Sequence, residues 1–429
     1  MKPKSPNEPT MPAPEFPAPA PVDPTSSSVA RPVRVLIVDT ASAFGGTLVV
    51  SRNLLKHLDP RRVEASLVSA CKDGFVTPGF AGTVPVRLLA PRLDYVTMGR
   101  WKATIHRRIR WAPLQRGLEI LAIVTEMIAN VPYLLRLIGL YRKLQVDIVH
   151  VNNYTMEPMW AARLLGIPIV YHLHGFVSPQ MDRSGRRNFQ KVDAFISISR
   201  VVTEAAVRAG IDRGRIHEIP NFVEQPPSGP PPPLPAMPVI GIFGRVTNWK
   251  GQKEFLRTAI QLLTEFPNLR VYVVGDASDG DQSYFQECLE IACNSQYPDN
   301  FVFTGRVSDV ASFYRKCTVV VHASTWPEPF GMVLIEAMAE GRPVVASIYG
   351  AASEIVQDGI DGYVVDPLDI RAVAARVSTL LRDTELATRM GRHGRIKIRT
   401  SYGPDEATRH FTRLYSEVYA AHRSIAGAH

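Results

Sequence analysis

Cysteine is scarce in this chain of 429 residues, with four in all, Cys71, Cys288, Cys293 and Cys317. None of them stands in a CxxC pair, and no cluster of histidines accompanies them. This pattern excludes a disulfide-rich secreted scaffold and a structural zinc site. We therefore expect reduced, mostly buried thiols in a cytosolic protein.

We also expect no signal peptide, because the first 30 residues are rich in Pro, Ala and Ser and have no apolar core. Its longest apolar stretch, Leu118–Leu140, is interrupted by Glu119, Glu126 and Arg136. Pro132 would kink a helix there. This stretch does not predict a convincing membrane span.

Proline is abundant, at 35 residues, and much of it lies at 1–32 and 225–238. We interpret the first segment as a disordered tail and the second as a stiff linker between two domains. The remaining boundaries are 33–224 for an N-terminal domain with an insertion at 92–145, 239–401 for a C-terminal domain, and 402–429 for a helix that returns to the N-terminal domain. Buried strands alternate with helices in both domains, which predicts two parallel α/β sheets.

One stretch of the second domain carries most of the chemistry. Thr318–Ala323 is β-branched and apolar, which predicts a buried strand, and Pro327 and Pro329 then force a loop. A helical pattern begins near Gly331, and Gly341 ends it. This strand–loop–helix unit places the loop at the carboxyl edge of the sheet, where such sheets bind ligands.

Glu328 in the loop and Glu336 in the helix flank this helix start. The amides of Phe330, Gly331 and Met332 lie between them and form a partly positive site. Carboxylates accept hydrogen bonds from sugar hydroxyls, so the pair fits a polyhydroxylated ligand. Taken alone, the two residues are better explained as a solvated loop residue and a surface helix residue. The acid/base pair of a glycoside hydrolase is a further alternative.

Two cations follow the first strand of the second domain. Gly244 and Arg245 come directly after Val239–Phe243, and Lys250 stands at the next predicted helix start. Arginine offers a planar fork to phosphate and lysine a point charge, so we expect them to converge on a diphosphate. A diphosphate site beside a hydroxyl-rich site is the shape of a nucleotide-sugar.

The first domain offers two weaker signals. Phe44, Gly45 and Gly46 follow the strand Val33–Asp39, as in a phosphate-binding loop, although a plain tight turn fits as well. His174 comes just after another predicted strand, where it could donate a hydrogen bond to a ligand.

Residues 92–145 combine ten Lys/Arg with three acids, a net charge of +7 within the +9 of the whole chain. On a helix, Glu119, Glu126, Asn130 and Tyr133 form a stripe of roughly 60°, which leaves a wide apolar face. A basic segment with tryptophans beside such a helix predicts contact with a membrane surface through 100–140. The alternatives are a long helix packed on the sheet with a solvated basic loop, and a nucleic-acid interface, which we do not expect.

These motifs together resemble the retaining glycosyltransferases of family 4, the group 1 glycosyltransferases. Glu328-Pro-Phe-Gly-Met-Val-Leu-Ile-Glu336 matches the family's E-x7-E motif, and Gly244-Arg245 with Lys250-Gly251 matches its diphosphate motif. Phe44-Gly45-Gly46, His174, Ile219–Val223, Ser347–Glu354 and Asp358–Tyr363 also fit, over roughly residues 33–420. The resemblance implies a GT-B fold, with two Rossmann-like domains facing an interdomain cleft.

The resemblance also implies roles. Arg245 and Lys250 would stabilise the departing nucleoside diphosphate, Glu336 would hold the ribose, and Glu328 with the amides of Phe330 and Gly331 would hold the donor sugar. The others would line the site as follows: Gly244 at the phosphates, Val307 near the base, Gly45 and Gly46 near the phosphates or the acceptor, and His174 facing the sugar. No metal and no cofactor are implied, and the partners would be a nucleotide-sugar donor and a glycan or lipid-linked acceptor at the inner face of the cell membrane.

The chain departs from the family at Asp276–Asp281, in place of Gly-Asp-Gly-Pro, and at Phe222, in place of glycine. Two further hypotheses remain at this point. One is a catalytically inactive, glycosyltransferase-like assembly partner at a membrane. The other is a sugar-nucleotide epimerase of similar fold.

Overall fold

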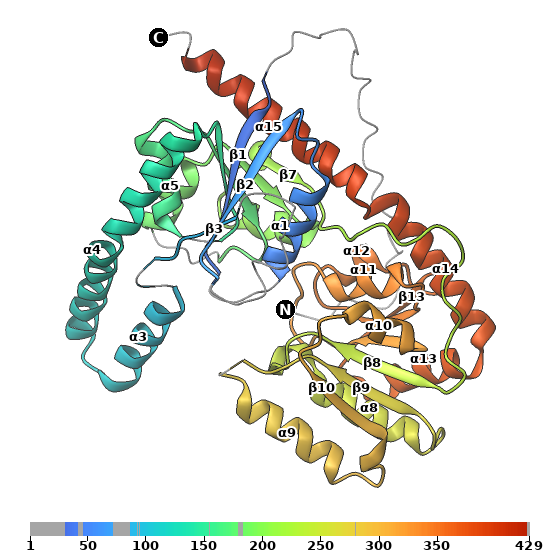
Figure 1. The fold of residues 1–429 in the computed structure, drawn as a ribbon. Helices are drawn as coiled ribbons and strands as arrows, with labels where there is room; N and C mark the ends of the chain where they lie inside the picture. The colour runs from blue at the N-terminus through green and yellow to red at the C-terminus, as the bar shows by residue number, and fades with distance from the viewer. Residues whose placement is uncertain are drawn as a thin grey trace. The chain divides into compact units, whose positions relative to one another are not determined.

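A computed structural model describes residues 31–41, 46–71, 86–91, 93, 95–153, 155–178, 183–278 and 280–426 (Figure 1). The chain divides into two compact units. The N-unit consists of Arg31–Gln225 and the residues from Ile398 onward, and the C-unit is described over Pro226–Lys397. Each unit is treated by itself below.

In the described part of the N-unit, seven parallel strands form one sheet in the order β3-β2-β1-β4-β5-β6-β7. The strands are β1 Val33–Asp39, β2 Val63–Ser69, β3 Val86–Leu88, β4 Ile148–Val151, β5 Ile169–Leu173, β6 Ala194–Ser197 and β7 Ile216–Glu218. Strand β4 is buried at every position, as expected of a strand covered on both faces. The strands expected from the sequence here are confirmed: Val33–Asp39 matches at both ends, and the ends of the others differ by at most two residues.

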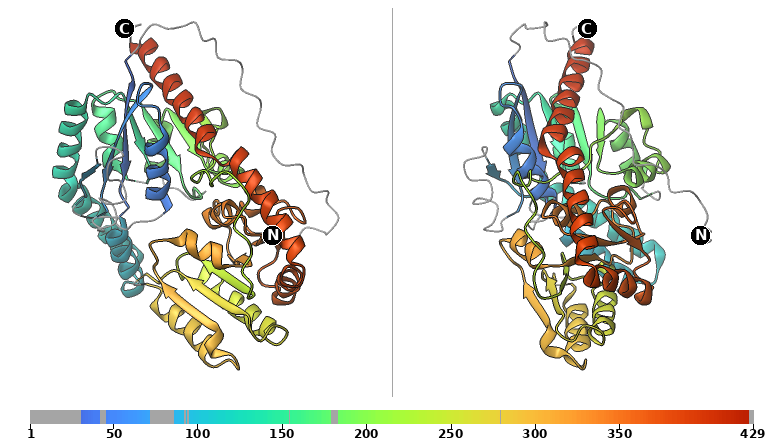
Figure 2. Two further views of the ribbon diagram at one scale, coloured as in Figure 1. Left: turned by 45° about the vertical axis from the view of Figure 1, so that its right-hand side comes forward. Right: turned by 90° about the vertical axis from the view of Figure 1, so that its right-hand side faces the viewer.

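Helices connect these strands and cover the sheet. They are α1 Gly46–His57, α3 Tyr95–Arg108, α4 Ala112–Leu144, α5 Met156–Leu164, α6 Arg183–Gln190, α7 Arg200–Arg208 and the short 3-10 turn η1 Arg213–Arg215. Ser199 caps α7 as the sequence indicated, since its hydroxyl accepts a hydrogen bond of 3.3 Å from the amide of Val202. The last helix, α15 Pro404–Ala426, packs on α1 and β1 (Figure 2). Its residues Phe411 and Tyr415 are buried in a hydrophobic core cluster together with residues of β1 and α1.

Helix α4 is continuous from Ala112 to Leu144, through Pro132. Its buried residues are Ala122, Asn130, Tyr133, Leu137 and Tyr141. The predicted polar stripe is therefore the side that meets the protein, and the apolar side is the exposed one. Among the described residues α4 is the one helix long and apolar enough to cross a membrane, a test that buried core helices also pass.

In the described part of the C-unit, six parallel strands form a sheet in the order β10-β9-β8-β11-β12-β13. The strands are β8 Val239–Phe243, β9 Arg270–Val274, β10 Phe301–Gly305, β11 Val319–His322, β12 Val344–Ser347 and β13 Gly362–Val365. The helices are α8 Gln252–Leu263, α9 Gln282–Cys293, α10 Val310–Lys316, α11 Met332–Ala339, α12 Ala352–Ile355, α13 Ile370–Arg382 and α14 Thr384–Ser401, with 3-10 turns η2 Asn248–Lys250 and η3 Pro298–Asn300. The division between the two units falls within α14, after Lys397. Lys250 thus ends a 3-10 turn, and the helix expected from it begins at Gln252, after Gly251 turns the chain at φ 73°.

The proline-rich segment is tied to the C-unit by two arginines. Arg342 is fully buried and donates to the carbonyls of Pro232 and Pro233 over 3.1 to 3.2 Å. Arg395, also buried, joins the carbonyls of Pro227 and Ala339 at 2.6 and 2.8 Å. Proline carbonyls are strong acceptors without a paired amide in the same residue, so these guanidinium groups supply their donors.

We expect Arg342→Met to destabilise the C-unit by about 2–4 kcal/mol, because two buried carbonyls lose their donor. For a unit of this size the midpoint of thermal unfolding should fall by roughly 5–12 °C. Calorimetry of the full chain measures the shift. Arg389→Met, at an exposed position of α14, is the matched control and should leave the midpoint unchanged; equal midpoints for both variants would refute the bracing role of Arg342.

Candidate active site

The site of the C-unit begins where β11 ends. The chain runs from His322 through the Pro327–Pro329 loop to Gly331, which adopts φ 110° and precedes the first residue of α11. This left-handed conformation favours glycine, and a Cβ there would also approach Leu334 to 3.1 Å. Phe330 is buried, so the loop and the start of α11 are fixed by packing.

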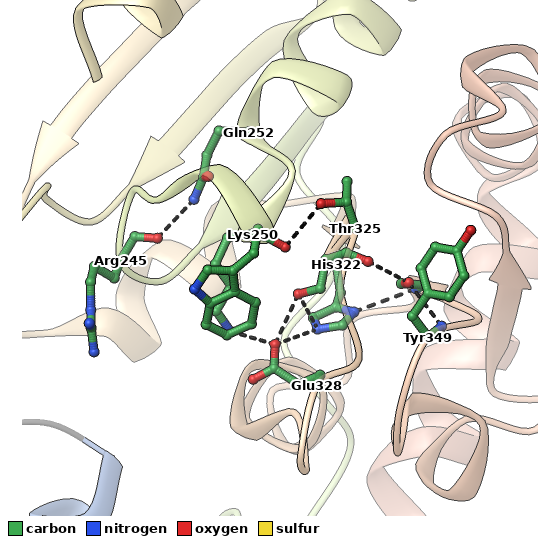
Figure 3. A network of polar contacts seen from close by, with 10 residues as sticks. Arg245, Lys250, Gln252, His322, Thr325, Glu328 and Tyr349 are labelled. Atoms are coloured by element: carbon green, nitrogen blue, oxygen red, sulfur yellow. Dashed lines mark hydrogen bonds and ion pairs between the residues drawn. The ribbon is translucent and has the colours of Figure 1, made fainter. Parts of the chain in front are cut away.

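Glu328 is the centre of a hydrogen-bond network (Figure 3). Its Oε2 accepts from Lys250 Nζ at 2.6 Å, from Ser324 Oγ at 2.9 Å and from His322 Nε2 at 3.4 Å. Only 8% of Glu328 is exposed. All three bonds reach one oxygen, so Oε1 is the oxygen that can accept from a ligand hydroxyl.

This network keeps Glu328 ionised. Burial by itself would raise the pKa of Glu328, but the hydrogen bond from His322 and the positive charge of Lys250 outweigh it and hold the pKa well below its usual range. An ionised carboxylate accepts hydrogen bonds and does not donate one. The arrangement therefore fits a binding and positioning group better than a general acid.

The backbone of Glu328 is fixed from the opposite side by the loop after β12. The amide of Glu328 donates to the Tyr349 carbonyl at 3.4 Å, and its carbonyl accepts from the amide of Ala351 at 2.9 Å. Gly350 lies between, and a Cβ at Gly350 would stand 2.2 Å from the Glu328 carbonyl oxygen. A residue larger than glycine at this position would displace Glu328.

Arg245 follows β8, one residue after Gly244, which has φ 121°. Its carbonyl accepts from Gln252 Nε2 at 2.9 Å, while its side chain is exposed and, among the described residues, has no hydrogen-bond or ion-pair partner. Figure 3 shows the guanidinium directed away from the Glu328 network. We expected Arg245 and Lys250 to converge, but the structure pairs Lys250 with Glu328 instead.

Glu336 is the fifth residue of α11, about one turn from its start, and is half-buried. Its Oε2 accepts a hydrogen bond of 2.8 Å from Tyr314, which lies on α10 and stacks on Phe243 with ring centroids 4.1 Å apart. Burial raises the pKa of the Tyr314 hydroxyl, so this hydroxyl is protonated and donates. Val307, the residue expected near a base, is half-buried in the turn between β10 and α10.

Two tryptophans lie beside this site and were not singled out from the sequence. Trp249 and Trp326 help to line a hollow of about 520 Å³ next to Glu328, together with Asn248, Thr325, Pro327 and Pro329. The loops that carry them are joined by the Thr325 amide, which donates to the Trp249 carbonyl at 2.9 Å. In the sequence only their positions pointed to the site: Trp249 comes immediately before Lys250, and Trp326 comes two residues before Glu328.

His322 and Ser324 were also missed. They come at the carboxyl end of β11, which is the place where a parallel sheet presents ligand groups. The Ser347 amide lies 3.5 Å from His322 Nδ1, so Nδ1 accepts and the proton sits on Nε2, toward Glu328. His322 and Ser324 orient Glu328, and in the sequence only their position at the end of a predicted strand indicated this role.

In the N-unit, His174 follows β5 and is half-buried. Its Nε2 lies 3.4 Å from Asn152 Oδ1, and its ring contacts that of His172 at 3.9 Å between centroids, with the two ring planes tilted by 31°. Burial lowers the pKa of His174 to about 3, so the ring is neutral at physiological pH. Gly46 is the first residue of α1, whereas Phe44 and Gly45 fall outside the described residues.

Among the described residues, no group of three or more His, Cys, Asp or Glu side chains is arranged to hold a metal ion. The four cysteines are free thiols, and Cys293 is the exposed one.

Comparison with known proteins places this fold and site in a family. The model described as "Glycosyl transferases group 1" matches residues 234–397, and "Glycosyltransferase Family 4" matches residues 44–225. The two matches cover both units and include the E-x7-E and Arg245–Lys250 motifs. The chain belongs to the group 1 glycosyltransferases of family 4.

Several relatives are named for their activities. The lipopolysaccharide core biosynthesis mannosyltransferase LpcC of Rhizobium leguminosarum is 28% identical over 44% of this chain and 54% of its own length. The D-inositol 3-phosphate glycosyltransferase of Streptomyces griseus is 32% identical over 46% of this chain and 43% of its own length. The matched region spans about half the length of these relatives or less.

Solved structures show the same fold over most of the chain. Anabaena HepE in complex with UDP-glucose has a TM-score of 0.71 and 21% identity, and the match covers 90% of this chain and 99% of that one. A sucrose-phosphate synthase from Thermosynechococcus elongatus has a TM-score of 0.68 at 19% identity, over 91% and 100% of the two chains. The expected GT-B fold, built of two parallel-sheet α/β domains, is confirmed.

Proposed function

We propose that this protein is a retaining, metal-independent glycosyltransferase of cell-surface glycan biosynthesis. It moves a sugar from a nucleoside-diphosphate sugar to a glycan or lipid-linked acceptor. The observation that carries the proposal is the ionised Glu328, held by Lys250 at 2.6 Å at the carboxyl edge of the C-unit sheet. The names of two relatives, a lipopolysaccharide core mannosyltransferase and a capsular polysaccharide glycosyltransferase, support the class of pathway.

Each side chain has a proposed task. Lys250 and Arg245 bind the diphosphate and stabilise the negative charge that develops on it as the bond to the sugar breaks. Glu336 accepts from the ribose hydroxyls, and Glu328 Oε1 accepts from a hydroxyl of the donor sugar, with the amides of Phe330 and Gly331 beside it. The two cations take the part that a divalent metal would otherwise play.

In the net reaction the acceptor oxygen replaces the diphosphate on the anomeric carbon of the donor sugar. The bond from the anomeric carbon to the diphosphate oxygen breaks and its electron pair stays on that oxygen. The acceptor oxygen bonds to the same carbon on the same face, and the proton of the acceptor hydroxyl passes to the departing diphosphate. For Gly45, Gly46 and His174 of the N-unit we keep the roles that the resemblance implies, namely contact of the two glycines with the phosphates or the acceptor and a hydrogen bond from the histidine to the sugar.

The other two sequence hypotheses are less well supported. An inactive assembly partner has no need of an intact Lys250–Glu328 pair, and this pair is present. Neither family model nor the named relatives point to an epimerase.

A donor sugar should raise the melting temperature of the full chain. At a ligand concentration of 100 Kd the stabilisation is about 2.7 kcal/mol, so the favoured one of a UDP-, GDP- and ADP-sugar panel should stand out in a thermal-shift screen. Glu336→Ala should abolish that shift, and Arg389→Ala on α14 should not. If no nucleotide-sugar shifts the melting temperature, the proposed function is wrong.

Retention of the anomeric configuration and metal independence are tested by separate measurements. Retention is tested by the coupling constant of the anomeric proton in the product, which should match that of the donor. Metal independence is tested by transfer in the presence of EDTA, which should proceed at an unchanged rate.

We also propose that the protein works in the cytoplasm as a peripheral protein on the inner face of the cell membrane. Support comes from the basic residues of 92–145 and from the exposed apolar side of α4. A lipid-linked acceptor would be presented at such a surface.

A further inference from the structure

Helix α4 has two faces that are reversed relative to an ordinary surface helix. On a helical wheel its five buried residues fall within about 100°. The exposed apolar residues Ile120, Leu121, Ile123, Val124, Met127, Ile128, Val131 and Leu135 fall within about 160°, centred roughly 130° away. Their exposures run from 42% to 67%, so the helix presents an unusually large apolar strip.

Hydrogen bonds of Asn130 fix this orientation of α4. Asn130 is 2% exposed; its Nδ2 donates to Glu157 Oε1 of α5 at 2.8 Å and to the Leu93 carbonyl at 3.0 Å, and its Oδ1 accepts from the Leu93 amide at 3.1 Å. Tyr133 and Leu137, on the same side, are buried as α4 packs on α5. Turning the apolar strip inward would break these three hydrogen bonds, of which the one to Glu157 is buried, so the strip is held outward.

Charge and aromatic residues surround one end of the strip. Trp111 and Arg110 precede α4, Arg107 and Arg108 end α3, and Arg116 lies in the first turns of α4; all of these are exposed. Tryptophan prefers the boundary between lipid tails and headgroups, and arginine attracts anionic headgroups. Figure 1 shows α3 and the first half of α4 as a hairpin that extends from the N-unit sheet.

We infer that α4 lies lengthwise in one leaflet of an anionic lipid bilayer, as an interfacial helix that does not span it. This deepens the proposed function, on which it rests, by naming how the enzyme meets its membrane. A spanning arrangement would carry the arginines of the hairpin tip across the hydrocarbon, which is costly. A spanning arrangement would also bring into the bilayer the half of α4 that packs on α5.

Four residues at heptad spacing make the inference measurable. Leu114, Leu121, Ile128 and Leu135 are 46%, 59%, 67% and 60% exposed and cover about 31 Å along one side of α4. In a Cys293→Ser background, each position is changed to cysteine one at a time and labelled with an environment-sensitive fluorophore. Lipids quenched at known depths then report the depth of each label.

A helix lying in the leaflet gives four similar depths, all below the headgroups. A span gives a profile that is deepest at the middle positions and overturns the inference. Labels that stay in water, or that are shielded by a second copy of the chain without lipid, also overturn it.

Vesicle flotation of the full chain gives an independent check. The double variant Val124→Asp/Ile128→Asp should bind phosphatidylglycerol-containing vesicles at least tenfold more weakly, and added salt should weaken the wild type. Leu164→Asp is the matched control, since Leu164 is an apolar α5 residue with 68% exposure in the same unit. If the double variant floats like the control, the inference is wrong.

Donor binding separates this outcome from a failure of the proposed function. The double variant should keep the full thermal shift with the favoured nucleotide-sugar. Loss of vesicle binding with an intact donor shift isolates the membrane contact, whereas a missing donor shift in the wild type concerns the enzyme assignment.

Discussion

Arg245→Ala is expected to slow sugar transfer by about 10²- to 10³-fold, the usual effect of removing one group that stabilises charge in a transition state. The guanidinium is exposed and, in the part of the chain that the structure describes, is not paired, so its loss should change the free energy of unfolding by less than about 0.5 kcal/mol. The effect should fall on kcat as well as KM, because the charge on the diphosphate grows as the bond breaks. Steady-state kinetics with the donor identified by thermal shift measures both constants.

Arg389→Ala serves as the comparison, since it removes an exposed arginine of the same unit away from the sheet edge. It should transfer at the wild-type rate. An Arg245→Ala enzyme that transfers as fast as the Arg389→Ala enzyme would remove Arg245 from the mechanism.

Lys250 offers a contrast because it has a second task. Lys250→Ala should lose activity and stability together, since it leaves the buried Glu328 carboxylate without its cation. In the double variant Lys250→Ala/Glu328→Gln the unpaired charge is gone, so stability should recover while activity does not.

The sequence was most informative where one residue type has one physical use. Gly331 and Gly341, with positive φ at the two ends of α11, were recognisable because glycine tolerates that conformation. The β11–α11 unit and its two carboxylates followed from strand and helix periodicity. The partner of Glu328 did not follow, since a lysine 78 residues away can serve a phosphate or a carboxylate, and the fold alone shows which one it meets.

Helix α4 shows a different limit. Periodicity identified its polar stripe correctly but could not say which way the stripe faces, because a polar stripe normally points to water. Here Asn130 finds its partners in Glu157 and Leu93, which lie on other elements. Which side of a helix is buried depends on its tertiary contacts, so it can be predicted from the sequence only when the contacting residues are known.

The N-unit is expected to lose stability between pH 7 and pH 5 because of two buried histidines at the centre of its sheet. His150 and His172 are 1% and 2% exposed and lie 3.2 Å apart between Nε2 and Nδ1, and His150 Nδ1 lies 2.6 Å from the Tyr415 hydroxyl of α15. Burial lowers the pKa of His150 to about 3, and it lowers the pKa of His172 well below its ordinary value. Neutral rings are thus built into the folded state.

The direction of the effect follows from proton linkage. Below its ordinary pKa of about 6.5 each histidine takes up a proton in the unfolded chain but not in the folded one, so acid favours unfolding. At pH 5 the loss is about 2 kcal/mol for a ring whose folded pKa is about 3, as for His150, and stability is regained as the pH rises through 6.5. Hydrogen-exchange protection of the β4 and β5 amides, corrected for intrinsic rates, should report this loss.

His172→Gln separates the histidines from the other groups that titrate in this range. The Nε2 atom of His172 has no hydrogen-bond partner in the described part of the chain, so the substitution should lower the stability of the N-unit only slightly at pH 7.5. Between pH 7.5 and pH 5 the variant should lose clearly less protection than the wild type, while the loss that comes from His150 and His174 remains. Equal losses in the two proteins would mean that the buried histidines do not control the acid sensitivity of this unit.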